Sequence, residues 1–166
     1  MKTETVNIRR QINGLIIFFM VSLAISGITA MPAREGITFL INVVPASWTF
    51  FYDFLMHMRE ALFNCDPVLF YGYDWLAFAH IVIAVLFYGV IKDPVRNIWV
   101  VEFGMIACML IIPFAFVMGS VRGIPVWWRL VDCSFGVVGI IPLLFVRSRI
   151  GALQKLIETE KLNTIF

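Results

Sequence analysis

Chemistry in this chain could be done by four ionisable side chains near one end of two apolar segments: Asp74, His80, Arg129 and Asp132. An imidazole can move a proton near neutral pH, and a guanidinium can hold an anionic head group. A carboxylate in hydrocarbon costs roughly 3 kcal/mol by insertion scales, so such a residue is expected to face a partner or a wet cavity. Asp132 is therefore a candidate for function.

The depth of these side chains is predicted from nearby tryptophans. Trp75 and Trp127 should mark the outer membrane interface, where aromatic residues gather. His80 and Asp132 each lie five residues further along, about 7 to 8 Å at the helical rise. They are thus predicted to lie at one level, within reach of a hydrogen bond or a single bridging water.

Two interpretations of this outer cluster are open. In the structural interpretation, His80 and Asp132 form a hydrogen bond with each other and hold two spans together. In the functional one, Asp132 holds the tautomer of His80 for catalysis, and Arg129, which could meet Asp74 or Asp132, binds a lipid or a small anion with Asp74. The chain has only two histidines, His57 and His80. Both would have to lie at one level to bind haem, so no cofactor is expected.

A second polar site is predicted near the opposite, cytoplasmic face. Glu102 follows Trp99 by three residues, which places it about 4 to 5 Å below that interface. This is too far from Asp132 for direct contact across a hydrocarbon core of about 30 Å. Glu102 is interpreted as a structural residue that pairs with Arg96 or Arg147.

Other kinds of site have no support in the sequence. Cys65, Cys108 and Cys133 have no metal-ligand spacing, and an odd number of cysteines cannot all pair in one chain, so neither a structural disulfide nor a zinc site is expected. No phosphate loop, nucleophile motif or HExxH signature is present. Whether the protein is an enzyme stays open.

Composition indicates the class of protein. The 166 residues are 61% hydrophobic and 14% charged, with a mean hydropathy of +0.91, whereas soluble domains carry about 25% charged residues. The net charge of +2 comes mostly from residues at the ends of apolar segments, so no nucleic-acid partner is expected. The chain is predicted to be an all-α integral membrane protein.

Four apolar segments predict a four-transmembrane-helix bundle in a single membrane domain. The expected spans are about 14–30, 75–91, 98–119 and 126–146, with Asp74 capping the second. A cleaved signal peptide ending at Ala30 is a weaker interpretation of the first span. The amphipathic tail 147–166 is expected to continue the fourth helix into the cytoplasm.

Residues 31–73 form the outer region between the first two spans. A helix is predicted from Trp48 to Asn64, where five polar residues recur on one face: Thr49, Asp53, His57, Glu60 and Asn64. This pattern is typical of an extracytoplasmic amphipathic helix in the membrane interface, and a metal site on the stripe is a weaker alternative. A fifth span from Ile37 to Met56 is also conceivable, although Pro45 and Asp53 interrupt it.

The distribution of basic residues predicts the orientation. Of the thirteen Lys and Arg residues, nine fall on the side of the termini, and the other four are Arg34, Arg59, Arg122 and Arg129. Because basic loops stay in the cytoplasm, both termini are expected there, and a bacterial cytoplasmic membrane is the expected location.

The functional expectation is a small structural or accessory component of a membrane complex, with membrane lipids and a membrane protein or a second copy as partners. The alternative is a membrane enzyme or transporter whose outward-facing pocket of His80, Arg129 and Asp132 handles a lipid or small anion. A pocket open to the outside would favour the alternative, and a dry, fully paired cluster would favour the first.

Overall fold

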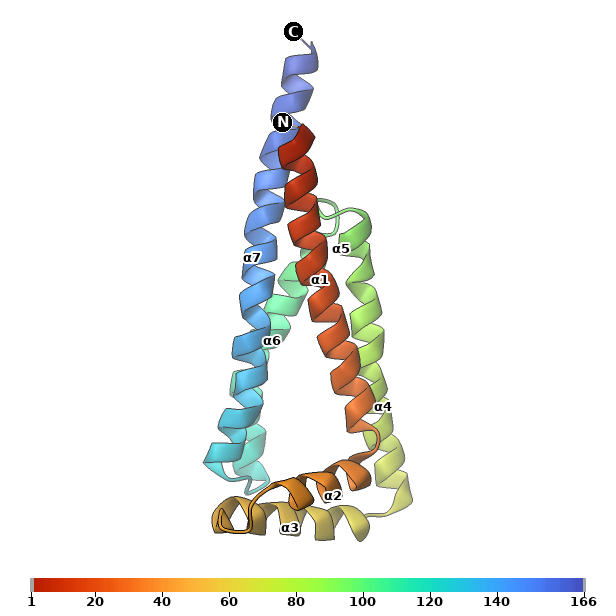
Figure 1. Ribbon diagram of the computed structural model, residues 1–166, viewed down its shortest axis with the longest axis vertical. Coiled ribbons are helices and arrows are strands. Elements are labelled where there is room, and N and C mark those ends of the chain that lie inside the picture. The colour runs from red at the N-terminus through yellow and green to blue at the C-terminus, as the bar shows by residue number, and fades with distance from the viewer. Residues whose placement is uncertain (1, 166) are drawn as a thin grey trace. The chain divides into compact units, whose positions relative to one another are not determined.

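The computed structural model describes the backbone of residues 2–165 and the side chains of residues 3–162. The described chain is 88% helical and contains no strand, which confirms the expected all-α class. Its helices, shown in Figure 1, are α1 (Lys2–Ala30), α2 (Ala33–Val43), α3 (Thr49–Phe63), α4 (Pro67–Leu86), α5 (Tyr88–Lys92), α6 (Ile98–Val121) and α7 (Val126–Ile165).

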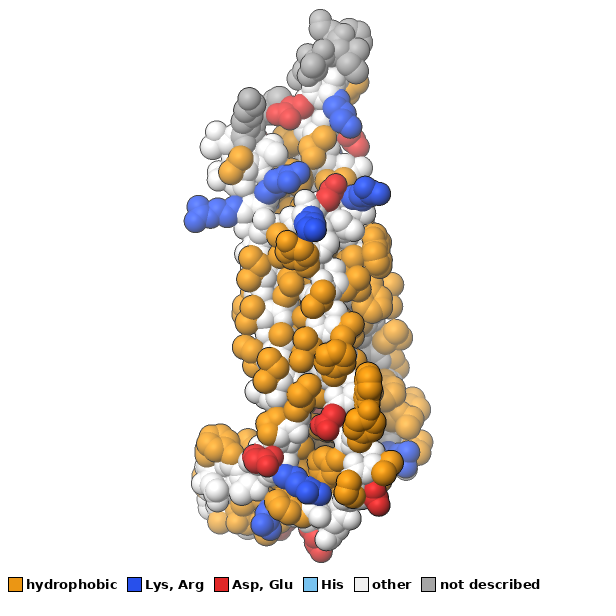
Figure 2. All heavy atoms as spheres, turned by 90° about the vertical axis from the view of Figure 1, so that its right-hand side faces the viewer, with side chains coloured by type: hydrophobic (Ala, Val, Ile, Leu, Met, Phe, Trp, Pro, Cys, Tyr) orange, Lys and Arg blue, Asp and Glu red, His pale blue; other side chains and the backbone are white. Residues whose placement is uncertain are grey.

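Four helical stretches are long and apolar enough to cross a membrane, as the sequence predicts: Thr3–Ala30, Pro67–Lys92, Ile98–Val121 and Val126–Leu162. The 24 residues of α6 extend about 36 Å, enough for a hydrocarbon core of about 30 Å. On the face in Figure 2, apolar side chains cover the middle of the helices, and charged side chains gather toward their ends.

Three of these helices extend by more than two residues beyond the expected spans. α1 begins at Lys2, not at Gly14, and α7 continues to Ile165, which confirms that the tail prolongs the fourth helix. α4 begins at Pro67 because proline suits the first helical position and because the Asp66 carboxylate accepts the Val68 N–H at 2.8 Å. The prediction that Asp74 caps this helix is wrong, since Asp74 lies inside α4.

The described chain divides into two compact units, residues 2–20 with 86–165 and residues 21–85. In the first unit, α6 and α7 pack closely along small residues. A Cβ on Gly136 would lie 2.5 Å from the carbonyl oxygen of Cys108, and one on Gly139 would lie 3.2 Å from the Cys108 sulfur. Cys108 of α6 therefore packs against two positions of α7, Gly136 and Gly139, that have no side chain.

The same unit has its largest buried side chain next to a further glycine. Phe87 is completely buried, and its ring would lie 2.7 Å from a Cβ on Gly104. The Phe87 ring also packs against Phe19 of α1, with 4.9 Å between the ring centroids. Gly104 is thus the position at which α6 leaves room for an aromatic core.

The turn from α6 to α7 has the geometry of a Schellman motif. The Ile124 N–H donates to the Gly119 carbonyl at 2.8 Å, and the Gly123 N–H donates to the Ser120 carbonyl at 3.3 Å. Gly123 has a φ of +67°, a conformation that glycine adopts without a Cβ clash. Pro125 follows and prevents α6 from continuing.

In the second unit, the last turns of α1 pack against α4, because a Cβ on Gly27 would lie 2.5 Å from the Ala77 carbonyl oxygen. α2 and α3 run side by side and are steeply inclined to α4 (Figure 1). The expected helix from Trp48 to Asn64 is confirmed as α3. The alternative fifth span is wrong, because its residues are divided between α2 and α3.

Candidate functional site

Arg129 lies in the first turn of α7 and connects it to the end of α6. Its Nε donates to the Ile124 carbonyl at 2.7 Å, and its Nη1 donates to Ser120 Oγ at 2.8 Å. The side chain lies directly over Gly119, where a Cβ would come within 2.7 Å of Arg129 Cδ. A cation placed over helix C-terminal carbonyls is favourable. Arg129 thus makes no ion pair with Asp132 in this unit, contrary to one predicted pairing.

Asp132 lies one turn further along α7 and is half-buried. Among the described residues of its own unit, no hydrogen bond or ion pair engages its carboxylate. Its carboxylate therefore remains available to a ligand or a partner.

His80 lies in α4, and its side chain is exposed, whereas Ala77 and Ala84 of the same helix are buried. Its Nδ1 lies 3.0 Å from the Leu76 carbonyl oxygen. Because a carbonyl can only accept, Nδ1 carries the hydrogen, and Nε2 remains for a second partner. Leu76 therefore takes the role that the sequence interpretation gave to Asp132. His80 and Asp132 belong to different units, and their proximity stays a prediction.

Glu102 pairs with Arg147, one of the two partners that the sequence left open. Arg147 Nε and Nη2 each lie 3.1 Å from Glu102 Oε1. The guanidinium of Arg96 forms no ion pair with Glu102. The backbone N–H of Arg96 donates to Asp93 Oδ1 at 3.1 Å. The Glu102–Arg147 pair holds α6 against α7 far from the turn that Arg129 braces.

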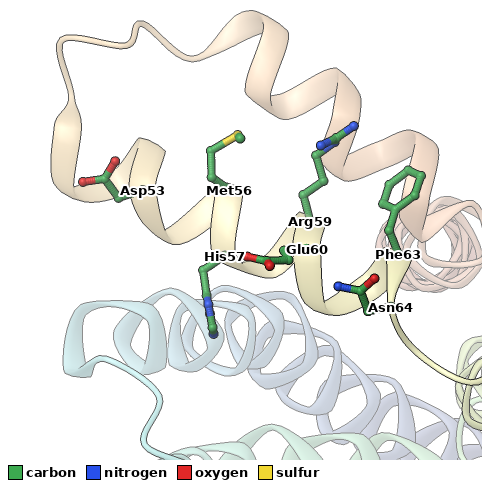
Figure 3. Close-up of a pocket in the computed structure, with 7 residues that line it drawn as sticks. All are labelled: Asp53, Met56, His57, Arg59, Glu60, Phe63 and Asn64. Carbon is green, nitrogen blue, oxygen red and sulfur yellow. The ribbon is translucent and has the colours of Figure 1, made fainter.

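The polar stripe of α3 is exposed along its whole length, as predicted. A cavity of about 560 Å³ lies beside it, and Figure 3 shows that Met56 and Arg59 point toward α2, whereas His57 points the other way. Within the described residues, no group of three or more His, Cys, Asp or Glu side chains could hold a metal ion. The stripe is therefore an exposed polar face of α3.

An arginine–aromatic cluster in the second unit was missed by the sequence interpretation. Arg34 of α2 donates through Nε to the Leu62 carbonyl at 3.2 Å, and its guanidinium carbon lies 4.5 Å from the Phe70 ring centroid. Arg34 and Arg59 lie 5.5 and 4.9 Å from the Phe63 ring centroid. The only available signal was a cation in an apolar segment, which must find carbonyls or ring faces.

Cys65 is half-buried, Cys108 and Cys133 are buried, and all three are free thiols.

No family model, curated protein or solved structure matches this chain. Its role is therefore inferred from its own residues and their geometry.

Proposed function

We propose that the protein is a small structural or accessory component of a membrane complex. The observation that carries this proposal is that two charged side chains of α7 connect it to α6. Arg129 braces their turn, and Arg147 pairs with Glu102. The two cavities described for the chain are lined by residues between Met31 and Asp74, outside these helices. Helices that are fixed to each other in this way suit a scaffold.

The exterior of these helices supports the same proposal. Phe114 of α6 and Phe135 of α7 are each 67% exposed, and many of their large aliphatic neighbours are exposed as well. Lipid tails or the apolar surface of another membrane protein would cover such side chains. A second copy of the chain or a different subunit would both fit this surface.

The proposed location is a bacterial cytoplasmic membrane, with both termini in the cytoplasm and α2 and α3 at the outer interface. The uneven distribution of basic residues supports this orientation. The exposed polar stripe of α3 supports an interfacial position for that helix.

The second candidate is a membrane enzyme or transporter that handles a lipid or small anion with His80, Arg129 and Asp132. It is favoured by the Asp132 carboxylate, which has no hydrogen bond or ion pair among the described residues of its own unit. The engagement of Arg129 with Ile124 and Ser120 speaks against it, because two of its donors already have acceptors.

Native mass spectrometry after gentle extraction tests the first candidate. We expect a second protein, or a second copy of the chain, at a fixed stoichiometry. A monomer that carries nothing but lipid would contradict the proposal.

Complementation of a deletion strain separates the two candidates. The double variant His80→Gln/Asp132→Asn should fold and should complement the deletion if the protein is a scaffold. A folded variant that fails to complement would favour the enzyme or transporter, because only those roles need the imidazole and the carboxylate.

A further inference from the structure

The second unit contains a cavity of about 300 Å³ where α1 passes into α2 and where α4 begins. Met31 and Ala33 line it from the first junction, and Pro67 lines it from the second. Two stretches long enough to cross a membrane therefore end beside this cavity. The ends of spanning helices lie at the level of the lipid head groups.

The lining of the cavity carries charges of both signs. Arg34 supplies a guanidinium, and Glu35 and Asp74 supply carboxylates. Among the described residues, Arg34 forms no ion pair with either carboxylate. Its position is explained by its other contacts, the Phe70 ring face at 4.5 Å and the Leu62 carbonyl at 3.2 Å. One cationic and two anionic groups thus remain separate around a shared space.

We propose that this cavity binds the phosphoethanolamine head group of a membrane phospholipid. The planar guanidinium of Arg34 suits a phosphate, to which it can donate two parallel hydrogen bonds. The ammonium of the same head group donates to the carboxylates of Glu35 and Asp74. A ligand with a single charge would satisfy only one side of the cavity.

Tyr71 and Phe70 complete the lining, and the Tyr71 ring packs edge-on against Trp75 at 6.1 Å. Aromatic rings of this kind favour the interface between hydrocarbon and water and attract cations. A choline head group has no N–H to donate to the carboxylates, and a glycerol head group has no cation. The site should therefore prefer phosphatidylethanolamine over phosphatidylcholine and phosphatidylglycerol. This inference goes beyond the accessory role and does not depend on it.

The test is native mass spectrometry of the full chain, released from nanodiscs that hold equal amounts of the three phospholipids with identical acyl chains. The wild-type chain should retain phosphatidylethanolamine preferentially. Asp74→Asn should lower the preference over phosphatidylglycerol about tenfold, the effect expected from one lost charge-assisted hydrogen bond. Arg34→Gln should weaken retention of all three lipids, because all three carry the phosphate.

Matched controls come from the neighbouring cavity. Arg59 also lies over the Phe63 ring, and Asp53 is an exposed carboxylate of the same unit, but both line the 560 Å³ cavity instead. Arg59→Gln and Asp53→Asn should therefore leave lipid retention unchanged. Equal losses in Arg59→Gln and Arg34→Gln would overturn the proposal, as would an unchanged preference in Asp74→Asn.

Soluble phosphoethanolamine distinguishes the two sources of this head group. At a concentration equal to that of the lipid it should not displace phosphatidylethanolamine, because it lacks the acyl chains that the membrane holds in place. Displacement at equal concentration would overturn the lipid as the ligand.

Discussion

Arg129 is a charged residue at the boundary between two apolar helices, and its contacts explain why it is tolerated there. The last carbonyls of α6 lack helical partners and carry the negative end of the helix dipole. The guanidinium donates to the Ile124 carbonyl just beyond that helix and to Ser120 Oγ within it. A residue that could have marked a binding site is therefore a brace for the α6–α7 turn.

Replacing Arg129 with Ala should lower the free energy of unfolding by about 1 to 3 kcal/mol, because it removes two charge-assisted hydrogen bonds. Arg129→Lys should recover little of this loss, since an ammonium lacks the guanidinium fork. Titration with SDS or urea in detergent micelles measures the change.

Arg122 provides the control, because it is exposed in the same turn and no side-chain contact of Arg122 is described. Arg122→Ala should change stability by less than about 0.5 kcal/mol. Equal effects of the two substitutions would show that the hydrogen bonds of Arg129 contribute nothing.

At the scale of the helices, the close approach of α6 and α7 depends on Gly136. Adding a methyl group there would bring it to 2.5 Å from the carbonyl oxygen of Cys108. That neighbour is backbone, which cannot rotate away. We expect Gly136→Ala to separate the helices and to lower the free energy of unfolding by about 1 to 3 kcal/mol.

Gly151 lies on the same helix, and a methyl group added there would meet nothing within 4 Å. Gly151→Ala should raise stability by about 0.5 to 1 kcal/mol, because alanine loses less conformational entropy in a helix. Unfolding titrations of both variants under one condition check the opposite signs. A Gly136→Ala variant at least as stable as the wild-type chain would refute the close approach of α6 and α7 at Gly136.

At the scale of the whole molecule, the basic residues predict that both termini face the cytoplasm. Cys65 lies in the link between α3 and α4 and is half-buried, whereas Cys108 and Cys133 are buried. In intact cells, a membrane-impermeant maleimide should label the native chain at Cys65, and Cys65→Ser should abolish the labelling.

Cysteines introduced at Thr3 and Thr159 in the Cys65→Ser background test the termini directly. They should stay unlabelled in intact cells and become labelled after the cells are broken. Labelling of either position from outside would refute the proposed orientation.

The sequence by itself determined the helical class, the four spanning candidates and the extension of α7 beyond the fourth span. These features follow from hydropathy and from the length of the apolar segments, which are local properties of the chain. The exposed stripe of α3 was equally predictable, because residues three and four apart share a helix face. The helix α2 was not predicted, and α4 began earlier than expected, because Asp66 and Pro67 start a new helix immediately after α3.

The tertiary structure alone decided which polar groups meet. Glu102 had two arginines at plausible depths, and only the packing of α6 on α7 selects Arg147, 45 residues away. Arg34 donates to the Leu62 carbonyl, 28 residues away, and helical periodicity predicts no contact at that separation. The depth of a side chain along a helix follows from the rise per residue. Which neighbouring helix the side chain faces depends on how the helices pack. The level of a side chain can therefore be read from the sequence, whereas its partner requires the packed fold.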